Sequence, residues 1–66
     1  MDVNLLKSKM ALNGDNQVEL SDALDITPNA LSFKMKQKND FKQSEIDIIA
    51  KRYDLTGDEI KQIFFN

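Results

Sequence analysis

The stretch that decides the fold is residues 17–38, which read QVELSDALDITPNALSFKMKQK. Apolar residues recur every three or four positions on both sides of a short break at residues 25–27, a spacing typical of two amphipathic helices. Thr27 followed by Pro28 predicts the start of the second helix, because threonine caps helices and proline at the first helical position gives up no needed hydrogen bond. So short a connection sets two helices at a steep angle, the helix-turn-helix arrangement, and Ile26 is expected to fill the corner.

The two helices beside this break have predictable ends. The first is expected to begin after its cap Asn16, with Glu19 three residues later as in a capping box, and to end at Leu24. The second is expected to run from Pro28 to about Gln37. Leu20, Leu24, Ile26 and Leu31 are predicted to supply the core that these two helices share.

Working outward, the same spacing predicts three more helices. One spans about residues 3–12 and ends at Asn13-Gly14, another is capped by Ser44, and the last is capped by Thr56. No segment alternates with the period of a strand. We therefore predict an all-α, compact five-helix domain, and a single domain over residues 1–66.

Composition narrows the possible functions. The chain has 66 residues, 41% apolar and 30% charged, which suits one small core. It contains neither cysteine nor histidine, which excludes Ser-His and Cys-His catalysis as well as imidazole and thiolate metal sites. The adjacent carboxylates Asp58 and Glu59 lie at a helix start without a partner base, so we expect no catalytic residue, no cofactor and no metal.

Location can also be predicted from the sequence. No apolar run reaches the roughly 18 residues of a membrane span, and the N-terminal residues carry neither the basic nor the apolar part of a signal peptide. We therefore expect a soluble cytoplasmic protein with no membrane partner.

The net charge of −2 argues against an anionic ligand, but the distribution of charge along the chain favours one. No basic residue lies between Lys9 and Lys34, whereas the segment 34–42 holds four lysines against the single acidic Asp40, a local charge of +3. A protein meets its ligand with one face, so such a cluster matters more than the sum. The alternative is that these lysines only solvate a surface.

Residues 17–27 and the following Leu31-Ser32-Phe33-Lys34-Met35 resemble the lambda-repressor-like helix-turn-helix domains of phage Cro and repressor proteins, the Xre family. The resemblance covers nearly the whole chain and extends to small regulators of temperate phages of Gram-positive hosts. It implies that the helix starting at Pro28, the third in chain order, reads the major groove of DNA. It also implies that Gln17 contacts the DNA backbone. The sequence departs from the family at three positions: Asp25 and Gln37 replace usual glycines, and Lys34 occupies a position often apolar, which leaves Met35 to carry that packing.

The third helix presents its candidate contacts on one outward stripe. With Leu31 facing the core, the residues on the opposite side are Asn29, Ser32, Phe33 and Lys36. Asparagine can pair with adenine, serine with donor or acceptor edges, and phenylalanine with a thymine methyl group, while lysine suits phosphate. The alternatives are that Asn29 is an ordinary solvated residue and that Phe33 covers the edge of the core or binds a protein partner.

Three further residues extend this surface. Thr27 offers a hydroxyl, although capping claims it first, and Lys38 with Lys42 would form a basic rim beyond the third helix. Glu19 and Asp22 would repel a duplex if they faced it. Either they point away from it, or this helix pair is not built for tight DNA binding.

The C-terminus presents a second candidate contact. If the last helix continues, Phe65 points away from the core, and together with Ile63 it would contact another molecule. That molecule would be a second copy in a two-fold dimer on a palindromic operator, or a partner repressor. The alternative is that the last turn unwinds and Phe65 folds back over Leu5 or Leu6.

Two functions follow from these patterns. The first is a sequence-specific DNA-binding transcriptional regulator, Cro-like or repressor-like, acting on an operator in double-stranded DNA. The second is a protein-interaction co-regulator of the same fold that binds a partner repressor. An enzyme is not expected.

Overall fold

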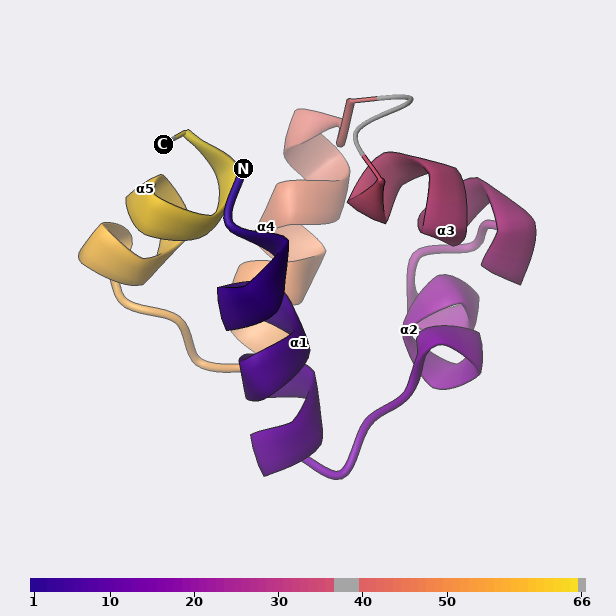
Figure 1. Cartoon of the computed structure of the whole chain (residues 1–66), viewed down its shortest axis with the longest axis horizontal. Helices are drawn as coiled ribbons and strands as arrows, with labels where there is room; N and C mark the ends of the chain where they lie inside the picture. Colours follow the sequence, from indigo (N-terminus) through magenta and orange to yellow (C-terminus); the bar gives the residue numbers. More distant parts are fainter. Residues whose placement is uncertain (37–39, 66) are drawn as a thin grey trace.

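The computed structural model describes residues 1–36 and 40–65. Within these ranges it holds five helices and no strand: α1 (Val3–Leu12), α2 (Gln17–Ala23), α3 (Pro28–Met35), α4 (Gln43–Arg52) and α5 (Gly57–Phe64). Figure 1 shows α2 and α3 on one side of the molecule and α1, α4 and α5 on the other. The predicted all-helical class is confirmed.

Most of the predicted helix starts are confirmed by their hydrogen bonds. The side chain of Asn16 accepts from the backbone N–H of Glu19 at 2.8 Å, and the Thr56 hydroxyl accepts from that of Glu59 at 3.1 Å. Each bond satisfies a backbone donor that the helix itself leaves unpaired. Glu59 also accepts from the Thr56 N–H at 2.9 Å, which completes the capping box of α5.

Two predicted helix boundaries are wrong. The start of α4 is not capped by Ser44, because the helix begins at Gln43 with Lys42 as its N-cap, and the carboxylate of Glu45 accepts from the backbone N–H of Lys42 at 2.8 Å. The longer glutamate side chain reaches back over the first turn and replaces the serine cap. Helix α3 ends at Met35 with Lys36 as its C-cap, short of the expected Gln37, which lies outside the described residues.

Three helices end in the same way. After α1, α2 and α4 the chain enters the left-handed region, at Gly14 (φ 65°), Asp25 (φ 57°) and Asp54 (φ 51°). At each place the next N–H bonds back to a carbonyl five residues earlier, at 2.9 to 3.0 Å. These are Schellman motifs, which satisfy carbonyl groups at the helix end and turn the chain sharply. Two of them use aspartate where glycine is usual, at some conformational cost.

One core joins all five helices. Its buried residues are Leu6, Met10, Leu20, Leu24, Leu31, Met35, Ile49, Tyr53 and Ile63. The N-terminal end is fixed to the last helix, since the backbone N–H of Asp2 donates to the carbonyl oxygen of Ile63 at 2.8 Å. No helix in the described part of the chain is long and apolar enough to span a bilayer.

A polar contact joins the α1–α2 loop to the end of α4. The carboxylate of Asp15 accepts from Arg52 Nε at 2.7 Å, from a terminal Arg52 nitrogen at 3.0 Å and from the Tyr53 hydroxyl at 2.5 Å. The hydrogen bond from Arg52 lowers the pKa of Asp15, and burial raises the pKa of Tyr53. Charged hydrogen bonds of this kind are among the stronger polar contacts in proteins.

Replacing Asp15 by asparagine should therefore lower the free energy of unfolding at pH 7 by about 2 kcal/mol. The pKa of Asp15 is lower in the folded than in the unfolded chain. Its contribution is thus complete above the unfolded pKa of about 4 and is lost as the pH falls through the folded value. Urea denaturation should show the difference between wild type and Asp15→Asn shrinking in acid. The same substitution at exposed Asp22 is the control, and a difference independent of pH would contradict the assignment.

Candidate nucleic-acid interface

The turn between α2 and α3 sets the direction of α3. The backbone N–H of Ile26 donates to the carbonyl of Ser21 at 3.0 Å, and that of Asp25 donates to Asp22 at 3.1 Å. Ile26 is half-buried and packs against the core, as predicted, so the turn is fixed both by hydrogen bonds and by an apolar contact. The small side chain of Ser21 is also buried, with its hydroxyl donating to the Val18 carbonyl at 2.8 Å.

The first turn of α3 is held by its cap. The Thr27 hydroxyl accepts from the backbone N–H of Ala30 at 3.1 Å, and Pro28 occupies the first helical position. Thr27 therefore serves the helix, as expected, while remaining exposed. Asn29 follows in the same turn and is also exposed, so its amide is accessible from outside the molecule.

The predicted outward stripe of α3 is largely accessible. Asn29, Phe33 and Lys36 are exposed and Ser32 is half-buried, whereas Leu31 and Met35 lie in the core. Phe33 is 51% exposed, so about half of its surface is accessible to a ligand. The stripe thus combines an amide, a hydroxyl, an aromatic ring and an amine.

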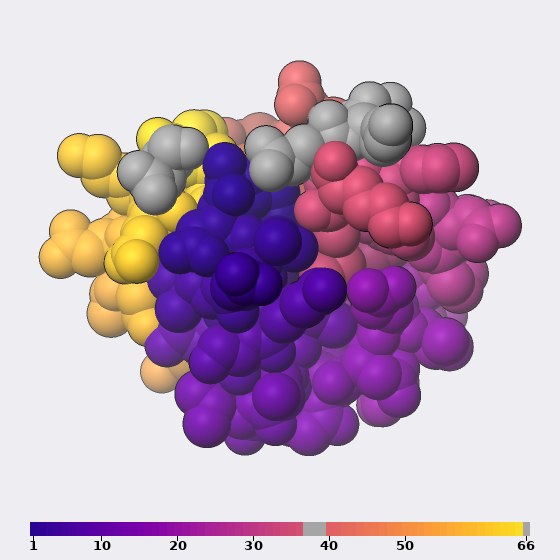
Figure 2. All heavy atoms as spheres, in the orientation of Figure 1, coloured from indigo at the N-terminus to yellow at the C-terminus, as the bar shows by residue number. Residues whose placement is uncertain are grey.

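A depression of about 330 Å³ lies beside this stripe, where α1, α2 and α3 meet. Figure 2 shows the three segments adjoining on one face, α1 in indigo, the start of α2 in purple and α3 in magenta to pink. The residues that line it are Val3, Lys7, Gln17, Ser32, Met35 and Lys36. Three predicted contact residues, Gln17, Ser32 and Lys36, are therefore brought together.

Lys7 is the residue that sequence reasoning missed. It lies on α1, 29 positions before Lys36 in the sequence, yet both line this depression. The sequence shows only that Lys7 follows the core residue Leu6 on the first helix. It does not specify which other helices pack beside that helix. With Lys7 included, the depression has two lysines among its lining residues and no carboxylate.

The acidic residues near α2 occupy other positions. Asp15 is held by Arg52 and Tyr53, and Glu19 lines a separate depression beside these residues. Asp22 is exposed near the end of α2 and does not line the depression around Lys7. The expectation that Glu19 points away from the Gln17 face therefore agrees with where the structure places it.

The predicted basic cluster at residues 34–42 needs correction. Lys34 is only 9% exposed, and its Nζ lies 3.0 Å from Glu45 Oε1. Its charge is neutralised inside the molecule, because helix α3 turns this position toward α4. Lys36 and Lys42 are exposed, and Lys38 lies outside the described residues.

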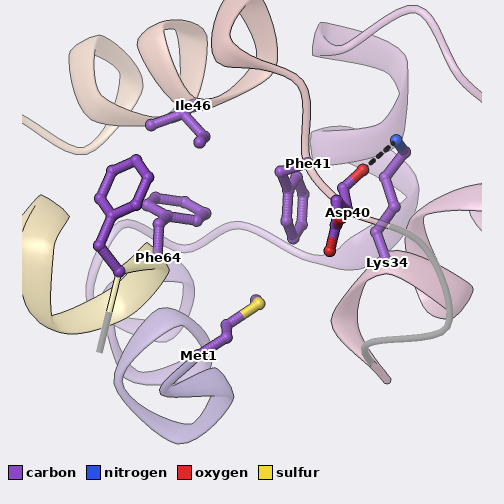
Figure 3. Close-up of a pocket in the computed structure, with 7 residues that line it drawn as sticks. Met1, Lys34, Asp40, Phe41, Ile46 and Phe64 are labelled. Atoms are coloured by element: carbon purple, nitrogen blue, oxygen red, sulfur yellow. Dashed lines mark hydrogen bonds between the residues drawn. The ribbon is translucent and has the colours of Figure 1, made fainter.

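Of the two residues predicted to form the C-terminal contact, Ile63 is wrong and Phe65 stays a prediction. Ile63 is fully buried in the monomer core, at 0% exposure, so its side chain cannot contact another molecule. Phe65 is 62% exposed, so it does not fold back over the core. With Met1, Phe41 and Phe64 it lines a cavity of about 400 Å³. Figure 3 shows the rings of Phe41 and Phe64 in this cavity; their centroids lie 5.4 Å apart, edge to face.

Comparison of the chain with family models, with curated proteins and with solved structures returns no match.

Proposed function

We propose that this protein is a sequence-specific DNA-binding regulator of the lambda-repressor-like helix-turn-helix type, in which α3 enters the major groove. The depression formed by α1, α2 and α3 is the observation that carries the proposal. It gathers Lys7, Gln17, Ser32 and Lys36 from three helices next to the exposed Asn29. Amines, an amide and a hydroxyl are the groups that proteins use to hold phosphate and to position a reading helix.

The proposal assigns different roles to the two parts of this surface. Lys7, Lys36 and Gln17 contact phosphate oxygens beside the groove, while Asn29 and Phe33 reach base edges from the outward stripe of α3. Thr27 and Ser32 add hydroxyl donors at the margin, and Lys38 is included from sequence alone. Glu19 and the Asp15–Arg52 pair lie in a separate depression, which limits repulsion between this acidic chain and DNA.

A second function is favoured by a separate observation. Phe33 and Phe65 leave 51% and 62% of their surfaces exposed, and large exposed aromatic side chains are typical of protein interfaces. In this alternative the protein is a co-regulator that binds a partner repressor, or forms a homodimer, through Phe65.

Selection from a library of duplexes with randomised centres, followed by binding measured at several salt concentrations, tests the first function. Lys7→Ala and Lys36→Ala should weaken binding to all sequences alike and reduce the salt slope by about one unit for each lost phosphate contact. Lys61→Ala on α5 is the matched control, because it removes the same charge from a helix on the opposite side of the molecule. Unchanged slopes in both variants would mean that the two lysines only solvate the surface.

Asn29→Ala should weaken binding to the selected duplex by about 1–3 kcal/mol and leave binding to random DNA unchanged, because one base-specific contact is lost. Thermal melting should be unaffected, since the side chain is exposed. Equal losses on selected and random duplexes would make Asn29 a backbone contact, and no loss would remove it from the interface. Gln62→Ala, an exposed amide on α5, serves as the control.

Phe65→Ser should leave the melting temperature unchanged, because the ring is 62% exposed. If Phe65 forms an intermolecular contact, sedimentation should show loss of self-association or of partner binding in this variant. A lowered melting temperature with unchanged mass would place the ring in the monomer's own packing instead.

A further inference from the structure

The side-chain ammonium group of Lys34, in the last turn of α3, is buried inside the protein. Lys34 is 9% exposed and its partner Glu45 is 5% exposed, with Nζ and Oε1 3.0 Å apart. The same Nζ donates to the carbonyl oxygen of Asp40 at 3.0 Å and lies 5.9 Å from the centre of the Phe41 ring. Figure 3 shows Lys34 reaching from α3 to the segment before α4. These three partners, Glu45, Asp40 and Phe41, all lie outside α3.

Stability alone does not explain this arrangement. Removing two charges from water is costly, and well-packed apolar side chains of similar volume often serve a core equally well or better. Leu31 and Met35 already bury the inner face of α3. An ion pair differs from an apolar contact in its demand for a fixed distance and direction, so it selects one arrangement of the elements that carry it.

Glu45 provides a rigid end for this link. Its Oε1 accepts both from Lys34 Nζ and from the backbone N–H of Lys42, at 3.0 and 2.8 Å. The carboxylate is thereby fixed to the first turn of α4, where negative charge is also favourable. In contrast, the most extensive backbone contact of α3 is with α2. The Lys34–Glu45 pair therefore ties the far end of α3 to the other half of the molecule.

We infer that Lys34 is a positioning residue: its ion pair with Glu45 sets the orientation of α3 relative to α4. The outward stripe that begins at Asn29 is carried on the same helix, so its direction depends on this pair. The consequence for sequence recognition rests on the proposed function, whereas the orientation of α3 does not.

The test is the double variant Lys34→Met with Glu45→Gln. It removes both charges together, keeps the volume nearly constant and leaves an amide oxygen to accept from the Lys42 N–H. The structure also offers a matched control, Lys9→Met with Glu59→Gln. Glu59 likewise caps its helix and pairs with a lysine of another helix, but it joins α1 to α5, away from α3.

In the Lys34–Glu45 double variant, residual dipolar couplings of the α3 amides should change relative to those of α4, and their hydrogen exchange should accelerate about tenfold. The ratio of affinities for selected over random duplex should also fall about tenfold, with random binding unchanged. The Lys9–Glu59 variant should keep wild-type values for α3 in all three measurements.

Wild-type couplings and exchange in the Lys34–Glu45 variant would overturn the inference, as would equal changes in the control. If the double variant does not fold, Lys34→Arg takes its place: a longer, planar cation should shift the α3 couplings at a nearly unchanged melting temperature, and unchanged couplings would overturn the inference. Absence of selective DNA binding in the wild type would overturn the proposed function, while the couplings still decide this inference.

Discussion

The left-handed turn at Asp25 is the constraint on which the rest of the structure depends. It ends α2, closes two hydrogen bonds to the last turn of that helix and brings Ile26 against the core. In a chain of 66 residues there is only enough apolar surface for one core, so each connection has to direct its helix onto that core. Because the turn does this, α3 can bury Leu31 and Met35 and still expose Asn29.

The candidate interface illustrates how a chain of net negative charge can present a basic face. Lysines from α1 and α3 line the same depression, while the carboxylates of Asp15 and Glu19 lie in another one. Asp15 is further neutralised by Arg52, in a contact that also holds the α1–α2 loop against α4. The separation of charge is thus a product of packing, and the same contacts that stabilise the fold keep acidic groups away from the face that we assign to DNA.

Lys34 shows why a count of charges along the sequence is an incomplete guide. Together with Lys36 it belongs to one basic run, but the two side chains leave α3 in different directions, one into the protein and one into solvent. The buried lysine adds no net charge to the surface, because Glu45 neutralises it. It acts instead on the geometry of the helix that bears the proposed contacts.

The sequence by itself determined the five helices, the caps at Asn16, Thr27 and Thr56, and the outward stripe of α3, because these depend on interactions between residues three or four positions apart. Only the tertiary structure decided that Lys7 joins Lys36 and that Lys34 meets Glu45. These facts depend on which helices pack together, and a local pattern gives the apolar face of each helix but not the neighbour that covers it. The predicted Ser44 cap was wrong for a related reason. Both Ser44 and Glu45 suit a helix start, but it is Glu45 that accepts the backbone N–H there. Glu45 is held in place because it is buried and paired with a lysine from another helix.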